Sequence, residues 1–137
     1  PGPTRPQTLH GRADLAKHWT ISAALAATTG ADLTTAMGQW KELSDSAPGG
    51  SGFSFVDLSA DRAGMKAGAA GVSPDRAEAL TVRMRGATPD SLLPLRALAL
   101  SEGLSEEEFV RRYQSISSAH YDAAIARIDG ILAQAAY

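Results

Sequence analysis

Polar side chains recur at helical spacing in three successive segments of the first half of the chain. The pairs, each three or four residues apart, are Asp14 with His18, Glu42 with Asp45, and Asp57 with Asp61. Residues at this spacing lie on one face of a helix. Each segment therefore presents two potential metal ligands or proton-transfer groups in a single direction.

The pair Asp57 and Asp61 is the most informative of the three. Two carboxylates one helical turn apart repel each other weakly when exposed, and burial raises that cost unless a cation or a shared proton offsets it. A bound metal ion would supply such a cation, and the nearest protein cations in the sequence are Lys17, Lys41 and Arg62. Gly64 and Gly68 continue the same stripe, so another backbone or a ligand can approach it closely.

The same residues also have a purely structural interpretation. Asp57 stands three residues after Ser54 and matches the acidic form of a capping box. Asp14 is favoured near a helix N-terminus by the helix dipole. Lys41 and Asp45 form an ordinary helical ion pair.

The elements that must position these groups are helices. Apolar periodicity, caps and breakers predict helices over residues 12–28, 31–46, 55–66 and 73–86, another beginning at Ser105, and a last one over 118–134. Short connections between amphipathic helices predict an all-α fold, a compact bundle or orthogonal array of about six helices. We expect a flexible proline-rich lead over residues 1–11 and one helical domain over 12–137, in which 12–66 bears the motifs and 73–137 is a C-terminal helical extension.

Three local features of this prediction can be checked against the structure. The expected apolar stripe of the second helix consists of Leu33, Met37, Trp40 and either Leu43 or Ser44. Residues 68–71 are expected to be a flexible joint, and Ser73 to cap the next helix with a proline at its first position.

Composition excludes several classes of protein. The chain has 137 residues with 13 basic and 15 acidic ones, a net charge of -2, and no basic cluster that would indicate nucleic-acid binding. We expect no transmembrane segment, because no apolar run approaches the roughly 20 residues that span a bilayer. Cysteine is absent, which excludes disulfides and thiolate metal ligands.

Two blocks of residues resemble the YfiM-like family of predicted periplasmic lipoproteins. The first block is Asp14-Leu15-Ala16-Lys17-His18-Trp19 with Ser22-Ala23. The second runs from Lys41-Glu42-Leu43-Ser44-Asp45-Ser46 through Gly50-Ser51-Gly52-Phe53-Ser54-Phe55 to Asp57-Leu58, Asp61 and Ala63-Gly64. The resemblance covers residues 13–64, and a fainter one, in the order of the histidine, glutamate and aspartates, is to the membrane-embedded VanZ-like envelope proteins.

The resemblance implies a periplasmic or cell-envelope location and a shared polar cluster, but it supplies no reaction. The cluster comprises His18, Lys41, Glu42, Asp45, Asp57 and Asp61. A cell-envelope component or a glycan is the partner that this location implies.

The first functional hypothesis is an envelope hydrolase in which His18, Glu42, Asp57 and Asp61 are catalytic. In one version His18, Glu42 and one of the two aspartates, Asp61 in the preferred set, bind a divalent metal ion that activates water. In the other, two carboxylates hydrolyse a glycan as acid and base, with Glu42 as the acid if apolar neighbours raise its pKa. The residues expected to contact substrate are Lys41, Asp45, Ser51 and Ser54.

The second hypothesis is a non-catalytic accessory or interaction domain of the cell envelope. Its polar cluster would be a buried network that fixes the register of the helices, with Lys41 and Arg62 neutralising the acids. The sequence leaves both hypotheses open.

Overall fold

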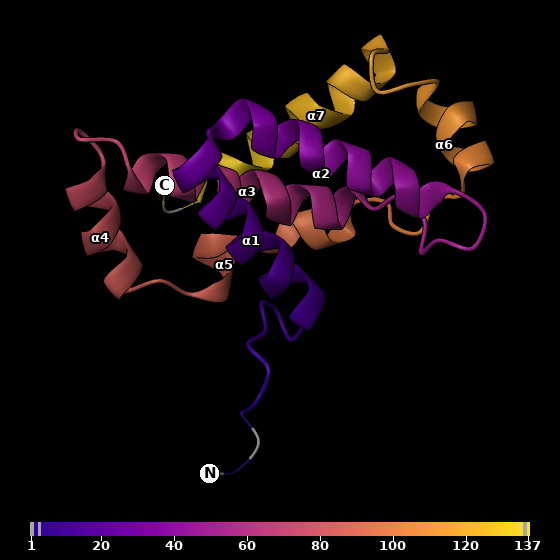
Figure 1. Ribbon diagram of the computed structural model, residues 1–137. Helices are drawn as coiled ribbons and strands as arrows, with labels where there is room; N and C mark the ends of the chain where they lie inside the picture. Colours follow the sequence, from indigo (N-terminus) through magenta and orange to yellow (C-terminus); the bar gives the residue numbers. More distant parts are fainter. Residues whose placement is uncertain (1, 3, 136) are drawn as a thin grey trace.

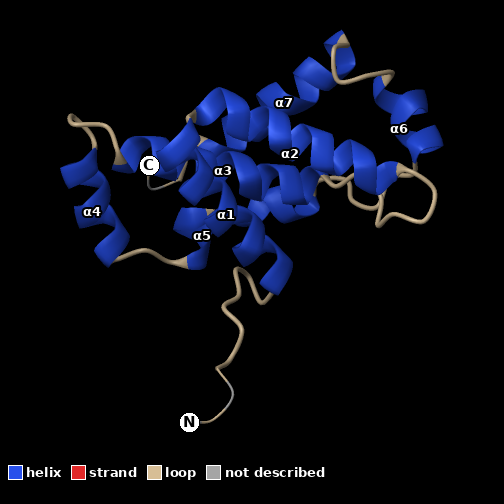
Figure 2. Cartoon of the chain, in the orientation of Figure 1, coloured by secondary structure: helices blue, strands red, loops and turns tan. Residues whose placement is uncertain are grey.

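The computed structural model describes residue 2, residues 4–135 and residue 137, and the fold is all-α (Figures 1 and 2). The helices are α1 (Ala13–Thr29), α2 (Ala31–Ser46), α3 (Phe55–Gly71), α4 (Ala77–Arg85), α5 (Pro89–Leu92), the 3-10 helix η1 (Leu95–Ala99), α6 (Glu106–Tyr113) and α7 (Ala119–Leu132). Among the described residues the only β pairing is two isolated bridges, Leu9 with Arg12 and Phe53 with Leu104. The predicted helical bundle is confirmed.

Helix α3 is the centre of the fold, and α1 and α2 pack against it (Figure 1). Ten of its seventeen residues are buried, more than in any other helix. They include small residues such as Ala60, Ala63 and Ala67, which lie between the neighbouring helices without holding them apart. Because both aspartates of the candidate site are on α3, the packing of this helix determines where the site lies.

The close packing of α1 on α3 depends on two glycines. A Cβ added at Gly64 would collide with the backbone carbonyl of Trp19, and one added at Gly68 would collide with that of Ala23. The prediction that another backbone approaches this stripe is therefore confirmed, and the backbone is that of α1. The contact holds the middle of α1 against the turns of α3 that follow Asp61.

Two predicted boundaries after residue 66 are wrong. Helix α3 continues to Gly71 through the expected flexible joint, in which Gly68 packs on the backbone of α1 instead. Ser73 does not cap α4, which begins at Ala77 with Arg76 in the N-cap position and no capping side chain. Residues 74–76 form a turn between the two helices.

The expected apolar stripe of α2 is also in the wrong place. Leu33, Met37 and Trp40 are exposed, and of the expected stripe only Leu43 packs against the core, where it is partly buried. The buried residues of this helix are Thr34, Glu42 and Ser46. Glu42 turns inward to accept the N–H of Ser54 in the loop before α3, while the hydroxyls of Thr34 and Ser46 bond the carbonyls of Gly30 and Leu43, so the buried groups find hydrogen-bond partners.

The C-terminal helices complete the core through an aromatic cluster. Phe53 and Phe55 pack against Phe109 and Tyr113 of α6 and Tyr121 of α7, with the first two ring centroids 4.9 Å apart. The predicted capping box of α6 is confirmed, since Ser105 and Glu108 bond each other's backbone N–H groups. These contacts hold the loop before α3 in place.

The end of the proline-rich segment packs on the helical body. Leu9 is buried, and Nε2 of His10 lies 2.6 Å from the backbone oxygen of Leu93. The lead is thus anchored at residues 9 and 10.

Within the described part of the chain, no helix has the length and apolarity needed to cross a bilayer.

Replacing Gly64 with alanine is expected to lower the free energy of unfolding by about 3 kcal/mol, because backbone on both sides of the contact must move. Gly130→Ala is the matched control. Gly130 lies within α7 with open space around its Cα, so alanine should raise stability by about 0.5–1 kcal/mol through its helix propensity. Urea denaturation measures both values. Equal effects of the two substitutions would contradict the proposed contact.

Candidate functional site

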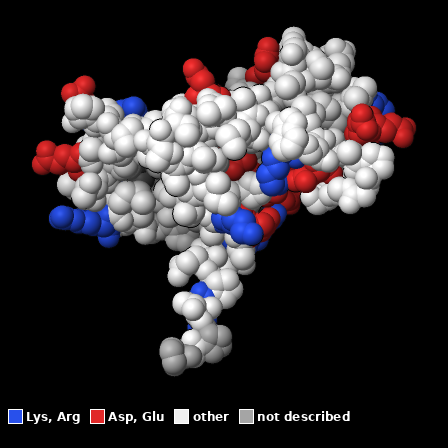
Figure 3. Space-filling model, in the orientation of Figure 1, with Lys and Arg blue, Asp and Glu red and all other residues white. Residues whose placement is uncertain are grey.

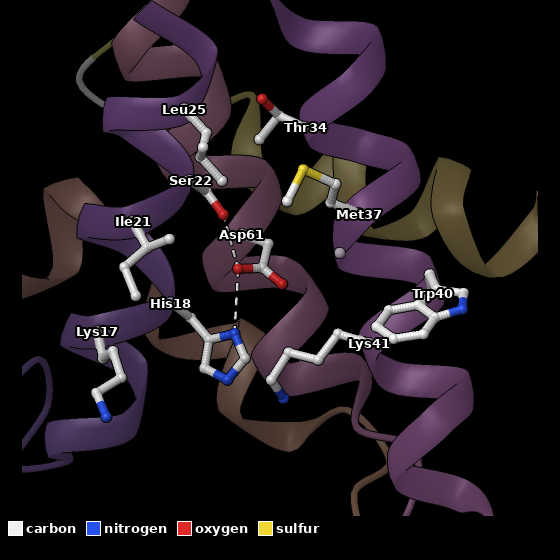
Figure 4. A pocket seen from close by; sticks show the side chains of 11 residues that line it. Lys17, His18, Ile21, Ser22, Leu25, Thr34, Met37, Trp40, Lys41 and Asp61 are labelled. Carbon is white, nitrogen blue, oxygen red and sulfur yellow. Dashed lines mark hydrogen bonds and ion pairs between the residues drawn. The ribbon is translucent and has the colours of Figure 1, made fainter. Parts of the chain in front are cut away.

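Helices α1, α2 and α3 bring His18, Glu42, Asp57 and Asp61 together, and Figure 4 shows His18 of α1 beside Asp61 of α3. His18 comes from α1, Glu42 from α2, and the two aspartates from successive turns of α3. The local sequence explains these placements. Ser54 caps α3 by accepting the N–H of Asp57 at 3.0 Å, which fixes the start of the helix and so the direction of both carboxylates.

His18 bridges the two aspartates. Its Nε2 lies 3.3 Å from Oδ2 of Asp57, and its Nδ1 lies 3.1 Å from Oδ1 of Asp61. All three side chains are less than one-fifth exposed. Burial opposes protonation of the imidazole, but hydrogen bonds to the aspartates and their negative charges outweigh it and raise the pKa of His18 to about 10.

Glu42 is a fully buried acid. Its Oε2 accepts the backbone N–H of Ser54 at 2.9 Å, and its Oε1 lies 3.5 Å from Nζ of Lys41. Burial raises the pKa of Glu42 to about 7, although the hydrogen bond from Ser54 and the charge of Lys41 act in the opposite direction. Glu42 also ties α2 to the loop before α3.

One carboxylate oxygen of Asp61 has hydrogen-bond partners and the other has none among the described residues. Its Oδ1 accepts a hydrogen bond from Oγ of Ser22 at 2.8 Å in addition to its contact with His18. Its Oδ2 is buried, has no hydrogen-bond partner among the described residues, and faces Gly38, whose added Cβ would lie 3.2 Å away. Oδ1 of Asp57 also lacks a hydrogen-bond partner among the described residues, but a guanidinium nitrogen of Arg12 lies 3.8 Å from it. Oδ2 of Asp61 is therefore the oxygen that can accept a donor or bind a cation.

Asp14 does not join the cluster, although it was paired with His18 in the sequence. Arg12 binds Asp14 at 2.5 Å and Glu102 at 2.7 Å, and its hydrogen bond holds the pKa of Asp14 below its usual value. Arg12 also lies 3.8 Å from Asp57. This role of Arg12 could not be inferred from the sequence, because Glu102 is 90 residues away. Ser22, named in the sequence only as part of the block that carries the family resemblance, was likewise given no role in the site.

The four residues expected to contact substrate are placed differently from one another. Lys41 and Asp45 form an ion pair at 2.6 Å, as the structural interpretation proposed. Ser54 is buried as the cap of α3. Ser51 is exposed and lines a separate cavity of about 450 Å3 between the glycine-rich loop and the start of α6. Only Lys41 among them lines the groove beside the cluster.

Arg62, expected to neutralise the acids, instead binds Asp129 of α7 at 2.8 Å.

A groove beside the cluster connects it to the surface. It is a cavity of about 250 Å3 between α1 and α2, with Asp61 of α3 at its floor (Figure 4). Its walls are mainly apolar, formed by Ile21, Leu25, Met37 and Trp40. The surface over α2 is mostly uncharged in its middle, with charged side chains toward its borders (Figure 3).

One subset of the cluster has the composition of a metal site. One ligand atom each from His18, Glu42 and Asp61 lies within 4.8 Å of the others. Ligands of a tetrahedral zinc ion are roughly 3.4 Å apart, so binding would require side-chain shifts of about 1 Å. An imidazole with two carboxylates is a donor set that zinc, manganese and iron accept.

Comparisons of the chain with protein-family models, with curated proteins and with solved structures found no match. The geometry of the site therefore carries the functional argument.

The free energy of unfolding of the metal-free protein is expected to fall as the pH rises from about 4.5 to 10. Glu42 and His18 both have a higher pKa in the folded protein than their usual 4.5 and 6.5, so the folded state binds more protons across this range. Urea denaturation in chelator at pH 5, 7 and 9 measures the trend. Glu42→Gln is the control, because it should remove the part of the change between pH 4.5 and 7. A stability that rises over this range would contradict the assignment.

Proposed function

We propose that the chain is a hydrolase-type domain of the cell envelope in which a divalent metal ion activates water. His18, Glu42 and Asp61 would hold the ion, and the single observation behind this is the approach of their ligand atoms to within 4.8 Å from three helices. The unpartnered Oδ2 of Asp61 supports it, because a buried carboxylate oxygen without a donor is costly unless a cation or water offsets it. The envelope location rests on the YfiM-like resemblance alone.

Each residue has a defined role in this proposal. The ion would lower the pKa of a bound water molecule and polarise the bond to be cleaved. Ser22 orients Asp61 through its hydrogen bond, and Asp57 is placed beside His18 to accept a proton from the ring or from water. For His18 to bind a metal ion it must first lose one ring proton, so binding competes with its ion pairs to the aspartates.

The glycan version of the hypothesis has less support. Glu42, its proposed acid, has the raised pKa that the reaction needs but is fully buried and does not line the groove. Two carboxylates that flank a sugar must both reach its glycosidic bond from opposite sides. A water-sized ligand or a metal ion fits beside Glu42 more readily than a sugar ring does.

A non-catalytic accessory domain is the second candidate, and the bridging position of His18 favours it. A protonated imidazole between two aspartates neutralises one of their two negative charges without any ligand, and the guanidinium of Arg12 lies 3.8 Å from Asp57. In this case the cluster would fix the register of α1 on α3. The two candidates differ in whether a metal ion displaces the proton of His18.

Calorimetric titration of the chelator-treated protein with Zn2+ or Mn2+ at pH 7.5 tests the proposal. We expect one ion per chain with proton release, and a higher melting temperature with the metal bound. His18→Ala and Glu42→Gln should each weaken binding at least tenfold. His120→Ala, an exposed histidine on α7, is the matched control and should leave binding unchanged.

Hydrolysis of p-nitrophenyl esters, phosphates and glycosides by the same samples separates the versions of the hypothesis. We expect cleavage that requires the metal ion and is abolished in Glu42→Gln, while circular dichroism shows an intact fold. Chelator-resistant cleavage of a glycoside would favour the two-carboxylate version. Absence of both metal binding and turnover would leave the accessory domain as the better account.

A further inference from the structure

A cavity of about 310 Å3 lies between α6, α7 and residues 99–101, and it shares no lining residue with the groove beside the cluster. One face of α7 forms a wall of it, because His120, Ala123, Ala124 and Arg127 follow the spacing of a single helix face. The two alanines extend only a methyl group from the helix, so they leave room between the longer side chains at either end. Helix α7 thus presents a small apolar surface with a basic side chain at each end.

A guanidinium held in place by its neighbours lines the cavity from α6. The Cζ atom of Arg112 lies 5.6 Å from the centroid of the Tyr113 ring, and its Nη2 donates to Oγ of Ser101 at 3.4 Å. Contact with an aromatic ring and one hydrogen bond restrict the conformations of this long side chain. A guanidinium has five N–H donors, so most of them remain available to a ligand.

The two arginines of the cavity have no counter-charge. Among the described residues neither Arg112 nor Arg127 forms an ion pair, and no carboxylate lines the cavity. The acids that stand close to them in the sequence are bound elsewhere in the fold. These pairs are Glu102 with Arg12, Glu108 with the N–H of Ser105, and Asp129 with Arg62. Two positive charges therefore face a cavity in a protein whose net charge is -2.

We propose that this cavity binds a phosphate monoester with a compact aromatic or apolar body. The two guanidiniums match the two negative charges that such an ester carries at neutral pH, and their planar N–H groups bond phosphate oxygens in pairs. The body would lie on Ala123 and Ala124, beside Leu100. The cavity is at the lower end of the roughly 300–1,000 Å3 of small-molecule sites, which suits a ligand with one ring.

Calorimetric titration of the whole chain with phenyl phosphate at pH 7.5 tests the proposal. Chelator in the buffer keeps the proposed metal centre out of the measurement. We expect phenyl phosphate to bind roughly tenfold more tightly than phenol, which lacks the charge, and than inorganic phosphate, which lacks the ring. Phenyl sulfate has the same shape but one negative charge, and we expect it to bind about fivefold more weakly.

One pair of variants tests the contact with the phosphate. Arg112→Gln should weaken phenyl phosphate binding roughly tenfold, because it removes a charge-assisted donor from the cavity. Arg111→Gln is the matched control. Arg111 is the exposed neighbour on the same helix and does not line the cavity, so its loss should weaken binding less than about twofold.

A second pair of variants tests the position of the ring. Ala123→Leu places an isobutyl group in the cavity and should weaken phenyl phosphate binding roughly tenfold while leaving inorganic phosphate unaffected. Ala126→Leu, an equally exposed position on another face of α7, should not change either affinity. Thermal melts of all four variants establish that they are folded.

Four results would each overturn the proposal. Equal losses in Arg111→Gln and Arg112→Gln would reduce the attraction to overall charge. Unchanged binding in Ala123→Leu would place the ring outside this cavity. Equal affinity for phenyl sulfate and phenyl phosphate would remove the match to two charges. Loss of phenyl phosphate binding in His18→Ala would place the ester at the metal-ligand cluster.

Discussion

A buried imidazole between two buried carboxylates is the interaction on which the rest of this structure depends. Asp57 and Asp61 lie one turn apart on the most buried helix, so they could not remain charged there without a cation. His18 supplies that cation from α1, at 3.3 and 3.1 Å. The pair of glycines that follows on α3 lets α1 come close enough for both contacts.

Helix α2 completes the centre in an unusual orientation. It directs Glu42 and the small residue Gly38 inward and leaves Met37 and Trp40 exposed. Glu42 in turn fixes the N–H of Ser54, which caps α3 and sets the position of Asp57. Because α2 packs on α3 through its polar face, the polar centre lies between the helices and the apolar side chains of α2 border the groove.

The helical class, the first two helices and the caps at Ser54 and Ser105 could be predicted from the sequence because they depend on neighbouring residues. Helical spacing placed Asp57 and Asp61 on one face, while the grouping of His18 with them was an expectation from the family resemblance. Three features could not be predicted, because each is decided by a distant partner. They are the outward apolar face of α2, the capture of Asp14 by Arg12 together with Glu102, and the ion pair of Arg62 with Asp129. Periodicity identifies an apolar stripe but does not identify what it packs against.

The protonation state of His18 is the most direct measure of the central claim. Nitrogen-15 chemical shifts of its ring, recorded on the metal-free protein between pH 6 and 11, report each nitrogen separately. Both nitrogens are predicted to remain protonated at pH 8, with titration near pH 10, because each donates to a buried aspartate. A ring that is neutral at pH 8 and titrates near 6.5 would show that the aspartates do not enclose it, and the proposed centre would not exist.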